Sequence, residues 1–186
     1  MYMSNTYNTY PVNVAGIERQ LRLFEIKPGV RIAILNILGD TEFVEAVARE
    51  LATKLRPTGG ELLVTPETKS IPLAHALSVV MKVPYVVLRK TWKPYMGDAL
   101  RAETLSITTG EPQYLFLDEK DRDLVASKKV ILLDDVISTG STLQGMRLIL
   151  DKAHANIVAE AAIFTEGDRA KWSNVIALGH LPVFVD

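Results

Sequence analysis

The segment Val130–Thr142, which reads VILLDDVISTGST, constrains the fold more than any other part of the chain. Its first seven residues are five apolar residues around two adjacent acids, Asp134 and Asp135. An apolar run without alternation is typical of a strand that is covered on both faces of a sheet. Because burying a carboxylate without a partner is costly, two acids at the end of such a strand indicate a functional site.

Further apolar runs and helix-like periods alternate along the rest of the chain. A loose alternation predicts a small hairpin or an irregular strand pair at 12–26. A short apolar run at 31–38 ends at Gly39-Asp40-Thr41, a typical helix start. Helices are predicted at 42–55, 71–81 and 142–153, and strands at 61–64, 84–88, 114–117, 128–136 and 157–164. Strands separated by helices indicate an α/β fold with a doubly wound, mainly parallel sheet flanked by helices.

Residues 91–110 form a mixed segment with only a weak period. A connection of about 20 residues is uncommon in a compact domain unless it is functional or disordered. We therefore expect a flexible lid over this range.

Composition bounds the class of protein. The 186 residues carry a net charge of −1 and no cysteine, so charge gives no case for nucleic acid or a membrane surface, and disulfides are excluded. No apolar run reaches the roughly 20 residues that span a bilayer, and the polar first residues do not resemble a signal peptide. We expect one domain, 1–186, in the cytoplasm.

The residues that follow the two acids predict the ligand. In open α/β sheets, ligands bind beyond the carboxyl ends of the strands. Ser138–Thr142 offers hydroxyls and consecutive amides that open onto a helix, which is a typical anion site. Carboxylates for sugar hydroxyls beside a phosphate site indicate a phosphorylated ribose. Gly140 is followed by Ser141 rather than Lys, so this is no P-loop, and no G-x-G-x-x-G is present.

The segment LLDDVISTGST resembles the signature of the type I phosphoribosyltransferases, in particular the adenine and xanthine enzymes. The resemblance implies that Asp134 and Asp135 hold the ribose of phosphoribosyl pyrophosphate and act in catalysis. It implies a 5′-phosphate site at Ser138, Thr139, Gly140, Ser141 and Thr142. It also implies a hood built from about 1–40 and 165–186, a homodimer, and Mg²⁺ held mainly by substrate oxygens rather than by the protein.

The resemblance extends to two segments that precede the signature. Residues 66–70 (PETKS) stand where the family has its pyrophosphate loop, although a plain strand-to-helix turn would look the same. Residues 87–94 (VLRKTWKP) resemble the run that opens the lid of the adenine enzymes, and a solvated basic strand end is the alternative. The implied pyrophosphate-binding residues are Thr68, Lys69, Ser70, Arg89, Lys90 and Lys93, and Lys93 is also a catalytic candidate. Closure of a lid would keep water from the reacting carbon.

The acceptor is less constrained. Residues 34–40 (ILNILGD) resemble the hood of xanthine enzymes, so Asn36 would read a purine edge or else only bond its own backbone. Residues 181–184 (LPVF) resemble the closing segment of the adenine enzymes. Adenine is therefore narrowly favoured over a 6-oxopurine. The candidate purine-binding residues are Asn36, Val136, Phe164 and Trp172, although an aromatic residue at the end of a buried strand is more often part of the core.

No general base is assigned. Ser138 and Thr109 stand where relatives carry an acid, and Glu111 is out of register. A sensor of phosphoribosyl pyrophosphate without catalysis is the alternative from another class. Purine repressors of this fold carry an added DNA-binding domain, for which we expect no room in this chain.

Overall fold

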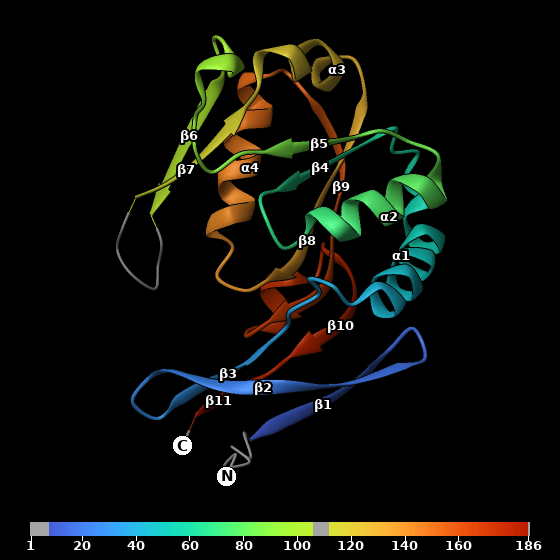
Figure 1. The fold of residues 1–186 in the computed structure, drawn as a ribbon, viewed down its shortest axis with the longest axis vertical. Helices are drawn as coiled ribbons and strands as arrows, with labels where there is room; N and C mark the ends of the chain where they lie inside the picture. The colour runs from blue at the N-terminus through green and yellow to red at the C-terminus, as the bar shows by residue number, and fades with distance from the viewer. Residues whose placement is uncertain (1–7, 106–111, 186) are drawn as a thin grey trace.

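A computed structural model describes residues 8–105 and 112–185. A parallel sheet of five strands in the order β10-β9-β8-β4-β5 forms its centre (Figure 1). The strands are β4 (Leu62–Pro66), β5 (Tyr85–Leu88), β8 (Lys129–Ile137), β9 (Asn156–Glu166) and β10 (Ile176–Leu181). The predicted doubly wound α/β sheet is thereby confirmed.

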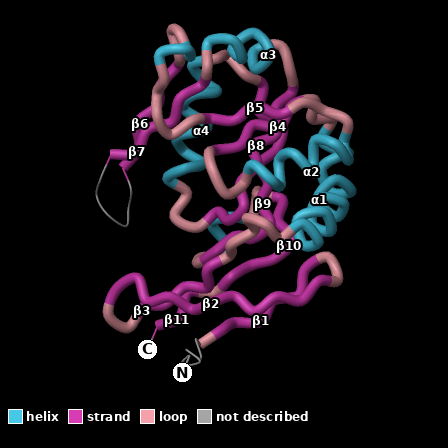
Figure 2. Tube along the Cα trace, viewed as in Figure 1, coloured by secondary structure: helices cyan, strands magenta, loops and turns pink. Residues whose placement is uncertain are grey.

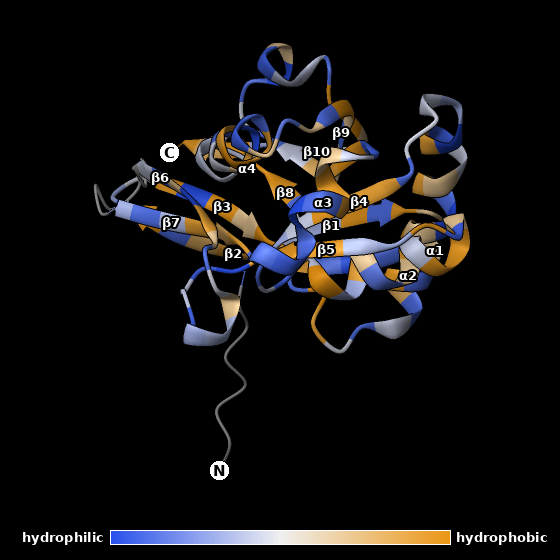
Figure 3. Cartoon of the chain, turned by 90° about the horizontal axis from the view of Figure 1, so that it is seen from above, coloured by the Kyte–Doolittle hydropathy of each residue, from blue (hydrophilic) through white to orange (hydrophobic). Residues whose placement is uncertain are grey.

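Helices cover both faces of this sheet. Along β8, Ile131 and Leu133 join one core cluster, whereas Val130 and Leu132 join the other, as the alternation of a strand requires. Figure 3 shows the apolar strands between the helices. The first cluster packs on α1 (Thr41–Leu55) and α2 (Ile71–Met81), and the second on α4 (Ser141–Lys152) and the short α3 (Arg122–Ala126).

The predicted helix start after the run at 31–38 is confirmed. The side chain of Asp40 caps α1 by accepting a hydrogen bond of 3.3 Å from the N–H of Phe43. Arg19 binds the same carboxylate at 2.8 Å, and this holds the pKa of Asp40 below its usual range. The pair therefore connects α1 to the N-terminal strands.

An antiparallel sheet with the order β1-β2-β3-β11 lies beside the body (Figure 2). It consists of β1 (Thr9–Val14), β2 (Ile17–Lys27), β3 (Val30–Ile34) and β11 (Val183–Val185). β1 and β2 form the hairpin expected at 12–26, and β11 adds the end of the chain to the same sheet. The rings of Tyr10 and Phe184 meet edge to face with their centres 5.3 Å apart. The two terminal segments thus share one sheet.

The segment 91–110 contains more regular structure than its sequence indicates. A short 3₁₀ helix, η2 (Pro94–Met96), precedes β6 (Leu100–Leu105), which pairs antiparallel with β7 (Pro112–Leu117). Thr109 and Glu111 lie outside the described residues. The hairpin packs on α4, since a Cβ on Gly145 would lie 3.2 Å from both Leu115 and Thr104.

Three further 3₁₀ turns complete the described elements: η1 (Arg56–Thr58), η3 (Glu119–Asp121) and η4 (Arg169–Trp172). Within the described ranges, every helix is too short or too polar to cross a lipid bilayer.

Candidate functional site

The two acids of the signature stand together where β8 leaves the core. The N–H of Asp135 donates a hydrogen bond of 2.9 Å to Oδ1 of Asp134. Thr65, on the neighbouring strand β4, donates its hydroxyl to the carbonyl of Leu133 at 2.9 Å and fixes the strand just before the pair. Burial, reinforced by the charge of Asp135, raises the pKa of Asp134 well above its usual range. Hydrogen-bond donors or a cation at this pair would therefore stabilise the charged form of Asp134.

The loop after the pair is open for an anion. Gly140 has a φ of +87°, and α4 begins at the next residue. Among the described residues, the N–H groups of Gly140, Ser141 and Thr142 donate to no acceptor, since the first helical bond runs from Gln144 to the carbonyl of Gly140 at 2.9 Å. A small hollow of about 30 Å³ lies here. It is lined by Asp134, Val136, Ile137, Ser138, Thr139, Gly140, Thr142 and Leu143. Asp134 therefore lines the same hollow as the predicted phosphate loop.

The predicted pyrophosphate loop lies between β4 and α2, next to the acids because β4 neighbours β8. Ser70 is buried and donates its hydroxyl to the carbonyl of Pro66 at 3.0 Å. Thr68 and Lys69 are exposed, and the peptide bond between Glu67 and Thr68 is cis. Of the three predicted residues, Ser70 thus supports the loop from within, whereas the other two face solvent.

Glu67 connects the pyrophosphate loop to the start of the predicted lid. Its carboxylate accepts a hydrogen bond of 2.9 Å from the N–H of Lys90 and pairs with Nε of Arg89 at 3.2 Å. The bond from Lys90 and the guanidinium of Arg89 lower the pKa of Glu67. Arg89 is thus occupied by Glu67, whereas the Lys90 side chain is exposed and lines, with Thr142, a cavity of about 210 Å³. Lys93 lies further along, with its side chain exposed.

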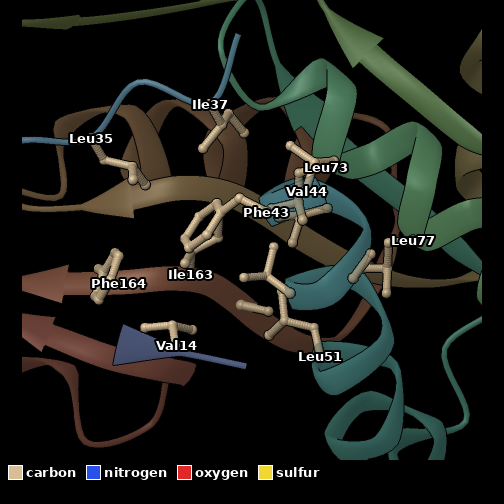
Figure 4. Packing of buried hydrophobic residues seen from close by; sticks show 14 of the residues in the cluster. Val14, Leu35, Ile37, Phe43, Val44, Leu51, Leu73, Leu77, Ile163 and Phe164 are labelled. Atoms are coloured by element: carbon tan, nitrogen blue, oxygen red, sulfur yellow. The ribbon is translucent and has the colours of Figure 1, made fainter. Parts of the chain in front are cut away.

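The candidate purine-binding residues fall into two groups. Asn36 is exposed, lines a cavity of about 460 Å³, and accepts a hydrogen bond of 3.3 Å from the N–H of Leu38. Val136 is half-buried. In contrast, Phe164 is 2% and Trp172 8% exposed. Figure 4 shows Phe164 near Val14 within the core. The role of all four in binding a base stays a prediction, and Asn36 and Val136 are the accessible members.

Comparison with known proteins assigns the family. The family model described as phosphoribosyl transferase domain matches residues 36–177. The chain belongs to the phosphoribosyltransferase family. The xanthine phosphoribosyltransferase of Chloroflexus aurantiacus is 30% identical over 159 residues, which are 82% of this chain and 74% of that protein.

Other relatives of this chain differ in their described roles. The purine biosynthesis transcriptional repressor PurR of Bacillus subtilis is 29% identical over 132 residues. The aligned region is 71% of this chain but only 46% of that protein. The chain thus spans about half the length of the first curated relatives that it matches. The crystal structure of adenine phosphoribosyltransferase from Thermoanaerobacter pseudethanolicus aligns with a TM-score of 0.71 at 19% identity, over 86% of this chain and 95% of that one. The fold is that of the type I phosphoribosyltransferases.

Two residues near the candidate site were missed from the sequence. Glu166 ends β9, next to β8; it is 8% exposed, its side chain has no partner among the described residues, and burial raises its pKa. The same signal that marked Asp134, an acid at the end of a buried strand, would have found it. Lys171 donates from Nζ to the carbonyl of Thr139 at 2.9 Å. No local sequence signal connects two residues so far apart in the chain.

Proposed function

We propose that the chain is a purine phosphoribosyltransferase of nucleotide salvage, which transfers 5-phosphoribose from phosphoribosyl pyrophosphate to a purine nitrogen. One observation carries the proposal: the carboxylates of Asp134 and Asp135 adjoin a loop whose amides are free for a phosphate. This combination suits a phosphorylated ribose, and membership of the family supplies the context.

The reaction requires positioning and charge stabilisation rather than a protein nucleophile. The bond from C1′ of the ribose to pyrophosphate breaks with its electron pair on the leaving oxygen, and the lone pair of the purine nitrogen forms the new bond. The proton of that nitrogen goes to solvent. Asp134 and Asp135 hold the ribose hydroxyls and face the positive charge that develops on the sugar, as carboxylates do in glycoside cleavage.

The leaving pyrophosphate collects negative charge at the edge of the sheet. Thr68 and Lys69 meet it from the loop after β4, Ser70 supports that loop, and Arg89, Lys90 and Lys93 meet it from the segment after β5. Because Glu67 already pairs with Arg89 at 3.2 Å, the exposed Lys90 and Lys93 carry more of the free positive charge. If the predicted lid moves, Lys93 within it and Lys90 just before it would close over the substrate.

Mg²⁺ fits this site as a companion of the substrate. Among residues 8–105 and 112–185, no group of three or more His, Asp or Glu side chains could hold a metal alone. Two carboxylates with substrate oxygens and water suit Mg²⁺, which keeps most of its coordination outside the protein. When bound, the ion would neutralise charge on the pyrophosphate, and Asp134 and Asp135 would hold it through the ribose oxygens.

Adenine is the favoured acceptor. The resemblance of residues 87–94 and 181–184 to the adenine enzymes favours it. The carboxyl of Glu166, at the end of the strand beside β8, would accept a hydrogen bond from an exocyclic amino group that reached it. A 6-oxopurine is the alternative, which the 30% identity to a xanthine phosphoribosyltransferase favours. A homodimer is expected for this family and is open to sedimentation analysis.

A regulator that senses phosphoribosyl pyrophosphate is the second candidate. The similarity to PurR of Bacillus subtilis favours it, because a repressor needs the ligand-binding fold without turnover. Both candidates bind the same ligand, and only the enzyme forms a nucleotide.

One assay separates these functions. The protein is incubated with phosphoribosyl pyrophosphate, Mg²⁺ and, in parallel, adenine, hypoxanthine, guanine or xanthine, and nucleotides are separated by chromatography. We expect AMP from adenine. A nucleotide from a 6-oxopurine alone would change the acceptor, and binding of phosphoribosyl pyrophosphate without product from any base would favour the regulator and contradict the enzyme.

A further inference from the structure

The turn η4 touches the phosphate loop from the side of the C-terminal segment. It follows β9, and the side chain of Asp168 caps it by accepting a hydrogen bond of 3.0 Å from the N–H of Ala170. Two of its side chains, Lys171 and Trp172, lie against Thr139 and Gly140. Residues distant in the sequence therefore meet at the loop that is proposed to hold the 5′-phosphate.

Lys171 fixes the orientation of one peptide group of the loop. Its Nζ donates a hydrogen bond of 2.9 Å to the carbonyl of Thr139. In a trans peptide the carbonyl and the following N–H point in opposite directions. The N–H of Gly140 is thus turned away from Lys171 and stays free for a ligand. The ammonium also places a positive charge against the outer side of the loop.

Trp172 supports the same loop by packing. A Cβ built on Gly140 would lie 2.5 Å from Cη2 of Trp172, so the indole lies directly on this glycine. The Nε1–H of Trp172 donates to the carbonyl of Glu166 at 3.2 Å, which anchors the ring to the end of β9. Nζ of Lys171 lies 4.7 Å from the centre of the ring, so the two side chains also hold each other by a cation–π contact.

We propose that Lys171 and Trp172 are positioning residues that hold Ser138–Thr142 in the form that binds the 5′-phosphate. The inference rests on the proposed role of that loop and deepens it, because it makes η4 a support of donor binding. Trp172, which is also a candidate for binding the base, contacts Gly140 of the phosphate loop. Occupation of the loop is therefore expected to change its fluorescence.

Ribose 5-phosphate is the probe, because it carries the 5′-phosphate without pyrophosphate or base. The chain has two tryptophans, Trp92 and Trp172, so the W92F variant leaves Trp172 as the single reporter. In this background we compare K171M, which removes the donor, with K171R, which keeps it. The titrations follow tryptophan emission, and thermal unfolding is measured for each variant.

We expect a saturable change of emission in W92F. K171M should weaken binding of ribose 5-phosphate by roughly tenfold, the size of effect expected for a hydrogen bond to a charged group, whereas K171R should retain most of the affinity. The unfolding temperatures should stay close together because Lys171 is exposed. In assays with turnover, K171M should raise KM for phosphoribosyl pyrophosphate and leave kcat nearly unchanged.

Equal affinity for ribose 5-phosphate in the W92F proteins with and without K171M would overturn the inference, and so would the absence of any binding in W92F. The test needs no base and no turnover. A protein that binds ribose 5-phosphate through Lys171 but forms no nucleotide would contradict the proposed enzyme and leave this inference standing.

Discussion

Asp134 accepts a hydrogen bond of 2.9 Å from the backbone of Asp135, and the charge of Asp135 adds to burial in raising the pKa of Asp134. A group whose folded pKa is raised binds more protons in the folded state. Its contribution to stability is full below its ordinary pKa of 3.8 and is lost as the pH rises through the folded value. The charged form of Asp134 therefore lowers the free energy of unfolding at neutral pH. Such a cost is expected of two adjacent acids that serve to bind a ligand.

Replacing Asp134 by Asn should therefore stabilise the protein while removing its ligand. We expect D134N to raise the free energy of unfolding at pH 8 by on the order of 1 kcal/mol, and by less at pH 5. Binding of phosphoribosyl pyrophosphate should fall sharply, because the amide lacks the charge. Urea denaturation at both pH values and calorimetric titration measure these effects. D151N, the same change at an exposed position on α4, is the control. An equal loss of stability at both pH values would contradict the account.

Gly140 should tolerate no side chain. An alanine there meets both an unfavourable φ of +87° and the ring of Trp172. Gly16 has a φ of +76° with nothing within 4 Å of a built Cβ, so G16A isolates the cost of backbone strain. We expect about 1 kcal/mol for G16A. G140A should cost more and also lose affinity for ribose 5-phosphate, as chemical denaturation and titration would measure. Equal effects of the two changes would argue against the packing role of Trp172.

Glu67 should influence how the substrate binds. E67Q weakens the contacts to Arg89 and to the N–H of Lys90, so we expect a several-fold higher KM for phosphoribosyl pyrophosphate and a loss of about 1 kcal/mol of stability at pH 7. Because the folded pKa of Glu67 is lowered, this stability is present above its ordinary pKa of 4.5 and is lost as the pH falls through the folded value. E45Q removes the exposed pair with Arg49 and serves as the control. Equal KM values for phosphoribosyl pyrophosphate in E67Q and E45Q would refute the link between Glu67 and substrate binding.

Glu166 should affect stability in the opposite sense with pH. Its pKa is raised by burial, so its contribution is full below its ordinary pKa of 4.5 and declines as the pH rises through the folded value. E166Q should raise the unfolding temperature more at pH 8 than at pH 5, and E50Q, on the exposed face of α1, should not. If the carboxyl meets an amino group of the acceptor, E166Q should also lower kcat/KM for adenine. An unchanged pH profile of stability would show that Glu166 is not strained by burial.

The sequence predicted the centre of the fold because its strands are buried on both faces. The run Val130–Val136 has no polar alternation, and Asp40 marks the start of α1. The buried strand and the helix start can therefore both be predicted from the local sequence. The hairpin of β6 and β7 is different. Its apolar face packs on α4, where Gly145 leaves room for Leu115 and Thr104, and this distant contact cannot be read from the local sequence.

The same distinction holds in the candidate site. Asp134, Asp135 and the loop that follows are contiguous, so their chemistry is visible in one segment. The contact of Lys171 with Thr139 and of Trp172 with Gly140 depends on how β9 returns beside β8, and no spacing in the sequence encodes it. Which of the candidate purine-binding residues are accessible also depends on the folded chain, since Phe164 is buried in the core.

The central claim is that the two acids hold the ribose of a substrate that the chain turns over. The direct measurement is the rate of pyrophosphate release from phosphoribosyl pyrophosphate with adenine and Mg²⁺, for the wild type and for D135N, with unfolding temperatures recorded for both. We predict that D135N loses most of the turnover, on the order of a hundredfold or more, while it remains folded. Undiminished turnover in a folded D135N protein would contradict the account.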